Sequence, residues 1–310
     1  MNIKTKGILF GIISAILWAF NSLLLTIYIQ ESVYFFAPLF FAFFHDIFSA
    51  FYLFLNIFRK KENRKQLLSI LRKKAFFIMF GAAILGGPIG MASFLMASKY
   101  IGSSYASSIS VLYPIAGAIL GKLFFHEFLN SYKKLAILLS ILGISILSFT
   151  TEGLTAYPHY DLGIFFALLC VFGWAFEGLI ASYFMTEINI SSEVAIFIRQ
   201  LCSSVFYILC VLPFIGGFSM IPLLIPTISI LKIILLSAFL GAVSYLFWYK
   251  AIDILGGPIG MLLNSSYVVW IVFLEILLAR VQIELKFIIT LVCILSSIFL
   301  LIKDSKGEKE

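Results

Sequence analysis

The stretch GIFFALLCVFGWAFEGLI, residues 163–180, repeats one near the start of the chain, GILFGIISAILWAFNSLL at residues 7–24. Seven of the eighteen aligned positions are identical. The shared Trp-Ala-Phe is followed by Asn21 in the first copy and by Glu177 in the second. Both copies lie in apolar runs long enough to cross a bilayer, so the sequence predicts two related halves.

The composition points to a membrane. The 310 residues are 62% hydrophobic and 12% charged, whereas soluble domains are about half apolar. The net charge is +7, but the basic residues gather in a few short clusters, which favours membrane topology over nucleic-acid binding. The four cysteines lie in apolar runs without Cys-x-x-Cys spacing. We therefore expect no disulfide framework, metal site or cofactor.

Apolar runs of about 20 residues predict ten transmembrane helices. They cover residues 7–29, 33–58, 75–98, 103–123, 132–150, 161–185, 193–215, 231–252, 257–278 and 284–302. The expected fold is an all-α integral membrane protein of two five-helix repeats, at residues 1–150 and 161–302. An external linker at 151–160 joins them, and a cytoplasmic tail follows at 303–310.

The distribution of Lys and Arg predicts the orientation. With the N-terminus inside, seventeen of the 22 basic residues fall on the cytoplasmic side and four outside, and Arg199 lies within a span. We therefore expect a multi-pass protein of the cell (inner) membrane with both termini in the cytoplasm. An odd number of helices per repeat turns the second repeat upside down, an arrangement found in secondary transporters.

The repeat continues along the chain. A shift of 154 residues places Tyr113 on Tyr267 and residues 97–100 on 251–254. With the two WAF helices, the segments ASKYIGSSYASSISVLYPIAGAI at 97–119 and LFFHEFL at 123–129 resemble the ten-helix EamA branch of the drug/metabolite transporter superfamily. The second segment is similar to the family's apolar-Gly-Glu ending, with His126 in place of Gly and Glu127 retained. The second half lacks this ending.

This resemblance implies a central cavity that moves small metabolites, often amino acids. It also implies that the first, third and fourth spans line the cavity together with the sixth, eighth and ninth. Small multidrug relatives carry a coupling Glu in their first helix. The resemblance makes Glu177 the matching residue here, in the second half alone.

Polar and aromatic side chains that share helix faces are the candidate substrate-binding residues, since lipid cannot satisfy polar groups. Asn21 and Glu177 are expected to form an amide wall and an acid wall of one site. The rings are expected to form much of the cavity wall and to stack on an apolar or cationic part of a substrate. The predicted residues are Trp18, Asn21, Ser110, Tyr113, Trp174, Glu177, Trp248, Asn264 and Tyr267.

Glu177 is expected to set the charge preference of this site. The sequence predicts no basic residue at its depth on the neighbouring spans, so the carboxyl should hold a proton until a cation replaces it. The alternative is a structural role, as a neutral acid bonded to a neighbouring helix. Ser110 has a similar alternative in close helix packing. Glu275 is expected to pair with Arg280 or to act as an outer gate.

Three further polar residues lie inside predicted spans: His45, Asp46 and Arg199. Their spans, 33–58 and 193–215, are not expected to line the cavity. A structural role is therefore predicted, with Arg199 bonded to backbone carbonyls or a carboxylate. The alternative is substrate binding. The His45 and Asp46 pair is also compatible with a proton relay or an enzyme dyad.

The heptapeptide LGGPIGM occurs at residues 85–91 and again at 255–261. In the first copy Pro88 follows Gly86 and Gly87 near the middle of a span, which predicts a kink and a candidate hinge. In the second copy Pro258 precedes an apolar run, as expected in the first turn of a helix.

Together these features predict a secondary transporter, an exporter or exchanger of small metabolites such as amino acids or amine-bearing compounds, working by alternating access. The expected partners are the bilayer, a small-molecule substrate and a coupling proton, without nucleic acid and with a monomer as the simplest assembly. One alternative is a carrier for S-adenosylmethionine or a nucleotide-like metabolite. Others are an integral-membrane enzyme acting on a lipid-borne substrate and a transporter-like receptor or scaffold.

Overall fold

The computed structural model describes residues 3–32, 34–71, 74–125, 131–148, 157–225, 227–278 and 285–307. Within these ranges all regular secondary structure is helical. Seven of the helical segments described are long and apolar enough to cross a membrane. The chain is therefore a multi-pass membrane protein, as its composition predicts.

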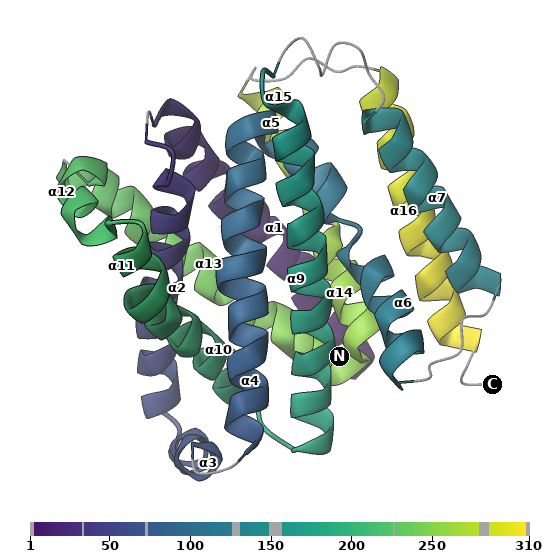
Figure 1. Cartoon of the computed structure of the whole chain (residues 1–310). Helices are drawn as coiled ribbons and strands as arrows, with labels where there is room; N and C mark the ends of the chain where they lie inside the picture. Colours follow the sequence, from purple (N-terminus) through teal and green to yellow (C-terminus); the bar gives the residue numbers. More distant parts are fainter. Residues whose placement is uncertain are drawn as a thin grey trace.

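The helices follow one another with short connections (Figure 1). In the first half they are α1 (Ile3–Glu31), α2 (Ala37–Phe58), α3 (Lys61–Ile70), α4 (Ala75–Ile84), η1 (Leu85–Met91), α5 (Ala92–Ser110), α6 (Tyr113–Phe125) and α7 (Ser131–Ser148). The second half contains α9 (Tyr160–Glu187), α10 (Ser192–Phe206), η2 (Tyr207–Val211), α11 (Leu212–Phe214), η3 (Gly217–Met220), α12 (Ile221–Leu224), α13 (Ile228–Leu255), α14 (Gly257–Ser265), α15 (Tyr267–Leu277) and α16 (Leu285–Gly307). η1 and η2 are π-helices, and η3 is a 3₁₀-helix.

The helices of the two halves pack against each other in pairs. α1 lies along α13, α5 along α9, α2 along α10, and α7 along α16. Figure 1 shows α7 and α16 standing together at one side of the molecule, away from α2 and α10. The remaining helices surround the middle of the bundle, where the candidate site lies.

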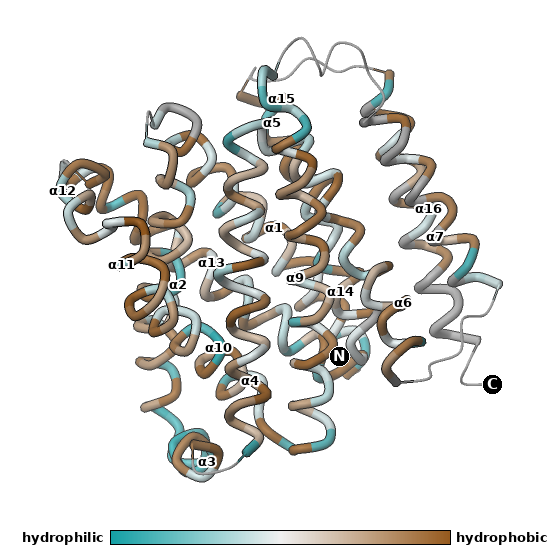
Figure 2. The backbone as a smooth tube through the Cα atoms, viewed as in Figure 1, coloured by the Kyte–Doolittle hydropathy of each residue, from teal (hydrophilic) through white to brown (hydrophobic). Residues whose placement is uncertain are grey.

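Polarity is distributed as expected for a protein in lipid. Buried positions include many polar groups, among them Ser14, Asp46 and Arg199, each fully buried. Large apolar side chains such as Leu209 and Phe299 are exposed instead. Figure 2 shows hydrophobic residues over most of the long helices and a hydrophilic concentration at α3, the short helix that joins α2 to α4. Buried polar groups in such a bundle must be satisfied by each other, since lipid offers no partner.

Two glycines mark equivalent backbone breaks in the two halves. Gly102 has φ 77° and ψ 160°, and Gly256, 154 residues later, has φ 88° and ψ 160°. This combination is accessible to glycine and strongly disfavoured for other residues. Each glycine ends one helical segment and lets the chain start the next at a new angle.

A second pair of breaks lies within the predicted spans 103–123 and 257–278, which were expected to be continuous. The helix is interrupted at Val111 and Leu112 in one and at Ser266 in the other. Pro114 explains the first break in part, because it has no amide hydrogen to donate to the preceding turn. Both interruptions immediately precede a tyrosine, Tyr113 or Tyr267.

The two LGGPIGM copies differ in structure, as their different places in the repeat predict. The first forms η1, a seven-residue π-helix with Pro88 inside it. The second runs from the end of α13 into α14, with Pro258 in the first turn of α14. π-helical turns inside α-helices often mark functional sites. Predictions for His126, Glu127, Arg280 and residues 151–156 of the linker concern positions outside the described residues.

Candidate substrate cavity

A small cavity lies at the centre of the bundle. Its wall comes from α1, α6, α9, α13 and α14, and its lining residues are Trp18, Tyr113, Trp174, Ser244, Tyr245, Trp248 and Asn264. The centre of a water molecule has about 10 Å³ to occupy there, which is room for about one water. The space in this structure is therefore smaller than a metabolite.

Aromatic rings make up most of the wall. Trp18 lies edge-to-face with Trp174 and with Tyr245, with 5.4 Å between ring centroids in each pair. Tyr113 is edge-to-face with Trp174 at 5.9 Å and with Trp248 at 6.1 Å, and Tyr245 lies 5.8 Å from Trp248. We call these five rings the aromatic cage. Each ring fixes its neighbour's tilt, because edge-to-face packing places a positive ring edge on a negative ring face.

Two cavity residues supply polar groups, and both are held by neighbours. Asn264 donates Nδ2 to Ser14 Oγ at 2.7 Å and accepts the Tyr113 hydroxyl at 2.9 Å. Ser244 donates to the Ser14 carbonyl at 2.8 Å, and the Ser14 hydroxyl lies 2.8 Å from the Ser244 carbonyl. These bonds join α1 to α13 and α14. They orient the two polar groups before any substrate arrives.

The broken helices are crosslinked by two hydrogen bonds related by the 154-residue repeat. The Tyr113 hydroxyl bonds Asn264 and the Met261 carbonyl, the latter at 2.7 Å. In the equivalent contact the Tyr267 hydroxyl lies 2.6 Å from Ser110 Oγ. Adding 154 to 113 gives 267, and adding 154 to 110 gives 264. Each tyrosine of one half thus bonds the polar residue three positions before its counterpart in the other half.

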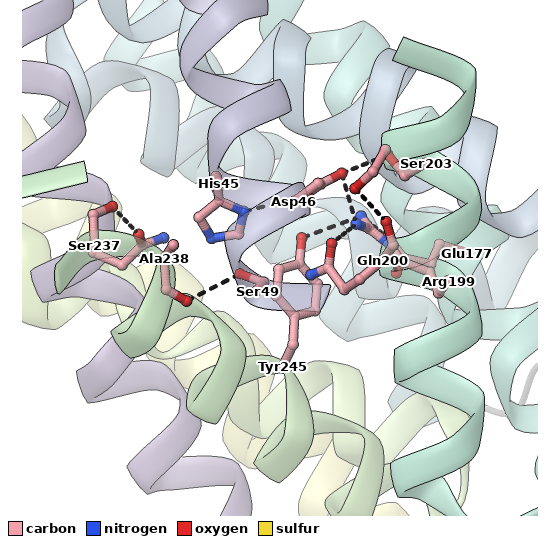
Figure 3. Close-up of polar contacts among 12 residues, drawn as sticks. His45, Asp46, Ser49, Glu177, Arg199, Gln200, Ser203, Ser237, Ala238 and Tyr245 are labelled. Carbon is pink, nitrogen blue, oxygen red and sulfur yellow. Dashed lines mark hydrogen bonds and ion pairs between the residues drawn. The ribbon is translucent and has the colours of Figure 1, made fainter. Parts of the chain in front are cut away.

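A second polar group lies beside the cavity, buried among α2, α9, α10 and α13 (Figure 3). Arg199 donates Nε and Nη2 to the two carboxylate oxygens of Glu177, at 2.7 and 3.2 Å. Its Nη1 donates to Asp46 Oδ2 at 3.2 Å. Asp46 also accepts from Ser203 at 2.5 Å, and its Oδ1 lies 3.1 Å from His45 Nδ1. We call Asp46, His45, Glu177 and Arg199 the ion network.

The ion network corrects the prediction for Glu177. No cation was expected at its depth, yet Arg199 of α10 forms a two-pronged ion pair with it, and Tyr249 donates a further bond at 3.0 Å. Glu177 does not line the cavity. Helical spacing placed it within one turn of Trp174, but spacing alone does not tell which neighbouring helix each side meets. The carboxylate that Arg199 was predicted to bond is thus Glu177, together with Asp46.

Asn21 also lies away from the cavity. Its side-chain oxygen accepts a bond from Ser237 of α13 at 2.5 Å. The expected arrangement, with Asn21 and Glu177 as opposite walls of one site, is therefore not present. The two residues are equivalent in the repeat, but Asn21 bonds α13 of the other half, whereas Glu177 bonds α10 and α13 of its own half.

The structure divides the predicted site residues into three groups. The residues that line the cavity are Trp18, Tyr113, Trp174, Trp248 and Asn264. Ser110 and Tyr267 bond each other next to it, and the Tyr267 ring lies 6.4 Å from that of Trp174. Asn21 and Glu177 lie elsewhere. The prediction missed Ser244 and Tyr245, although both share the side of α13 that carries Trp248, four and three residues later.

Glu275 lies apart from the cavity, between α15 and α5. Its carboxylate accepts hydrogen bonds from Ser103 and Ser104, which begin the helical segment after Gly102. A carboxylate at a helix N-terminus also interacts favourably with the helix dipole. Its predicted partner Arg280 is outside the described residues.

A bundle of apolar helices that buries its polar groups and encloses a central aromatic cavity defines the class, a multi-pass membrane transporter. Comparison with known proteins agrees. The chain belongs to the EamA-like transporter family, which matches residues 5–149 and again residues 161–303. The protein LicB of Haemophilus influenzae is 28% identical over 308 residues, 98% of this chain and 100% of LicB. A solved crystal structure has the same fold, with a TM-score of 0.63 and 17% identity over 99% of each chain.

Proposed function

We propose that the protein is a secondary transporter for small metabolites that carry a methylated ammonium group, and that the aromatic cage binds this group. The observation that carries the proposal is the wall itself. Five rings converge on one cavity, and no carboxylate lines it. The only carboxylates near it in the described part of the chain, those of Glu177 and Asp46, are already paired with Arg199.

The chemistry of the wall favours methylated over primary amines. A primary ammonium has three N–H donors and requires three acceptors on burial. The cavity offers few, because the Asn264 side-chain oxygen already accepts the Tyr113 hydroxyl and the other lining residues apart from Ser244 are aromatic. A methylated ammonium needs no acceptor, and its positive charge is attracted to the electron-rich faces of Trp and Tyr. Burial of its methyl groups against the rings adds a hydrophobic contribution.

The indole N–H groups of Trp18 and Trp248 have no hydrogen-bond partner among the described residues. A buried donor without an acceptor is costly. A substrate oxygen, such as a hydroxyl, would provide the missing acceptor when the cavity is occupied. We therefore propose a substrate with an ammonium head and a hydrogen-bond acceptor a few bonds away.

The architecture that we propose for this activity is ten transmembrane helices in two inverted repeats, residues 1–150 and 161–302, with both termini in the cytoplasm. The equivalent backbone breaks at Gly102 and Gly256 and the two separate family matches support it. In alternating access each half repeats the movement of the other, so that the cavity opens to one side at a time.

A space this small implies that its wall must move to admit a metabolite. η1, which contains Gly86, Gly87 and Pro88, is the proposed hinge, because Pro88 has no amide hydrogen to donate and the π-helical turn interrupts the α-helical bonding on either side of it. We also propose that the protein exchanges a proton for the cationic substrate. Substrate added outside proteoliposomes should then drive protons out, and an enclosed pH dye reports it.

Uptake into proteoliposomes tests the proposed substrate class. Choline is ethanolamine with three N-methyl groups added. The protein should therefore transport choline but not ethanolamine or neutral amino acids. Trp248→Leu removes a cage ring and should abolish uptake. Trp270→Leu is the matched control, since Trp270 is a partly buried tryptophan of α15 outside the cage. Equal rates for the two amines, or equal effects of the two variants, would contradict the proposal.

A further inference from the structure

We propose that Asp46 determines the preference of the cavity for a cation, by leaving the ion network with one uncompensated negative charge behind the aromatic cage. This inference rests on the proposed function and adds a specificity residue that does not touch the substrate. It is argued from the hydrogen-bond donors of Arg199, the charges in the ion network and the contacts between the network and the cage.

The guanidinium of Arg199 has no donor left for anything else. It carries five N–H donors. Nε and one donor of Nη2 bond Glu177, and the second donor of Nη2 bonds the Tyr245 hydroxyl at 3.3 Å. The two donors of Nη1 bond Asp46 and Gln200, at 3.2 and 2.9 Å. Arg199 is fully buried, and its five donors are used by Glu177, Asp46, Gln200 and Tyr245.

The charges do not cancel. Two carboxylates face one guanidinium, which leaves a net charge of −1 when both carboxyls are ionised and the His45 imidazole is neutral. Glu177 has the two-pronged pair with Arg199, whereas Asp46 has a single guanidinium contact and otherwise a serine and a histidine. No other Lys or Arg forms an ion pair with either carboxylate in the described ranges. An unbalanced charge in a membrane interior is costly, so a nearby cation stabilises it.

The ion network lies against the cage wall. The Arg199 guanidinium sits 4.8 Å from the Tyr245 ring centroid, and Tyr245 lines the cavity. The His45 ring, bonded to Asp46, lies 6.1 Å from the centroids of both Trp18 and Tyr245. Rings alone attract a cation weakly. A net charge behind them acts through protein of low polarity, where it is screened less than in water.

The test compares choline with 3,3-dimethyl-1-butanol, which has the same shape without the charge. Quenching of cage tryptophan fluorescence in detergent gives both affinities at a pH of about 8.5, where histidine is ordinarily neutral. One unit charge at about 10 Å and an effective dielectric constant near 20 changes affinity by roughly ten-fold. Asp46→Asn should therefore lower the choline-to-alcohol affinity ratio by roughly ten-fold and leave the alcohol's affinity unchanged.

Charge and geometry are separated by further variants. Asp46→Glu keeps the negative charge on a longer side chain and keeps Arg199 as its partner, so the ratio should stay as in the parent chain. Asp46→Ser is a second neutral variant and should lower the ratio as Asp46→Asn does, which keeps the test available if Asp46→Asn does not fold. Ser203→Ala removes a bond to Asp46 without changing charge and should leave the ratio as in the parent chain.

An unchanged ratio in Asp46→Asn or Asp46→Ser, or a fall of equal size in Asp46→Glu or Ser203→Ala, would each overturn the inference. These outcomes leave the proposed function standing, provided that the parent chain binds choline. If the parent chain binds neither compound, the proposed function itself fails.

Discussion

Gly90 shows how a single backbone position shapes the cavity. A Cβ atom at this position would lie 2.6 Å from Cδ1 and 2.8 Å from Nε1 of Trp174, closer than real Cβ contacts allow. Gly90→Ala should therefore tilt Trp174 out of the cage and raise the KM for choline several-fold. Gly81→Ala on α4 is the matched control, because nothing lies within 4 Å of its added Cβ. Uptake kinetics that are the same for both variants would contradict this account of the cage.

Glu177 and Glu275 are buried carboxylates with different partners, and this predicts different costs of neutralisation. Glu177→Gln leaves the Arg199 guanidinium facing an amide, and breaking a buried ion pair costs roughly 3–5 kcal/mol in soluble proteins. Glu275→Gln keeps an acceptor for the hydroxyls of Ser103 and Ser104, which can rotate to meet it. Thermal unfolding in detergent should show a clearly larger loss of Tm for Glu177→Gln. The reverse order would mean that Arg199 does not depend on Glu177.

At the residue scale, the sequence placed four of the five cage rings among the candidate site residues, but it also placed Glu177 there. Trp18 and Trp174 were identified because the repeat placed them at equivalent positions of two helices. Glu177 was assigned to the cavity because a carboxylate inside a span suggests function. Its true neighbour, Arg199, lies on another helix, and no pattern within one helix reveals a contact between two. Asp46, Glu177 and Arg199 lie on α2, α9 and α10. That two carboxylates share one arginine becomes apparent only when these three helices are packed together.

At the scale of elements, the broken helices are the feature that sequence patterns could not show in full. Pro114 signals an interruption before Tyr113, but Ser266 has no comparable signal, because serine is tolerated in membrane helices. The glycine breaks at Gly102 and Gly256 are visible as equivalent letters of the repeat. Their positive φ angles follow from the close return of the next segment, which is a property of the packed bundle.

The hydrogen bonds that Tyr113 and Tyr267 each make to the opposite half, here called the crossed tyrosine bonds, predict unequal losses of stability for two matched substitutions. Tyr113→Phe removes the single hydroxyl proton that the Asn264 oxygen and the Met261 carbonyl share, and so leaves two acceptors without it, whereas Tyr267→Phe removes one bond, to Ser110. Hydrogen bonds between membrane helices average ~0.6 kcal/mol, and Tyr113→Phe should lower stability by more than Tyr267→Phe. Unfolding in a denaturant series measures both losses. Equal losses would show that the second acceptor of the Tyr113 proton contributes nothing.

The same bonds also bear on transport. If the halves rock about the cavity, opening on one side separates one crossed pair while the other stays closed, since the pairs are equivalent under the repeat. Asn264 is additionally held by Ser14, so its pair with Tyr113 is the stronger of the two. Tyr267→Phe should therefore leave substrate binding nearly intact and change the rate of transport. A change in affinity without a change in rate would place Tyr267 in the binding site instead.

At the scale of the whole molecule, the seventeen-to-four distribution of basic residues predicts both termini in the cytoplasm and residues 151–160 outside. A cysteine at Thr155 should react with a membrane-impermeant maleimide in intact cells. A cysteine at Ser69, exposed on α3 in the basic segment, should react only after permeabilisation. The two repeats can be inverted in the membrane only if the segment with Ser69 and the linker with Thr155 lie on opposite sides of it. An odd number of predicted spans separates these two positions. Labelling of both cysteines from the same side would exclude the inverted repeat, and with it the symmetric exchange of the crossed tyrosine bonds.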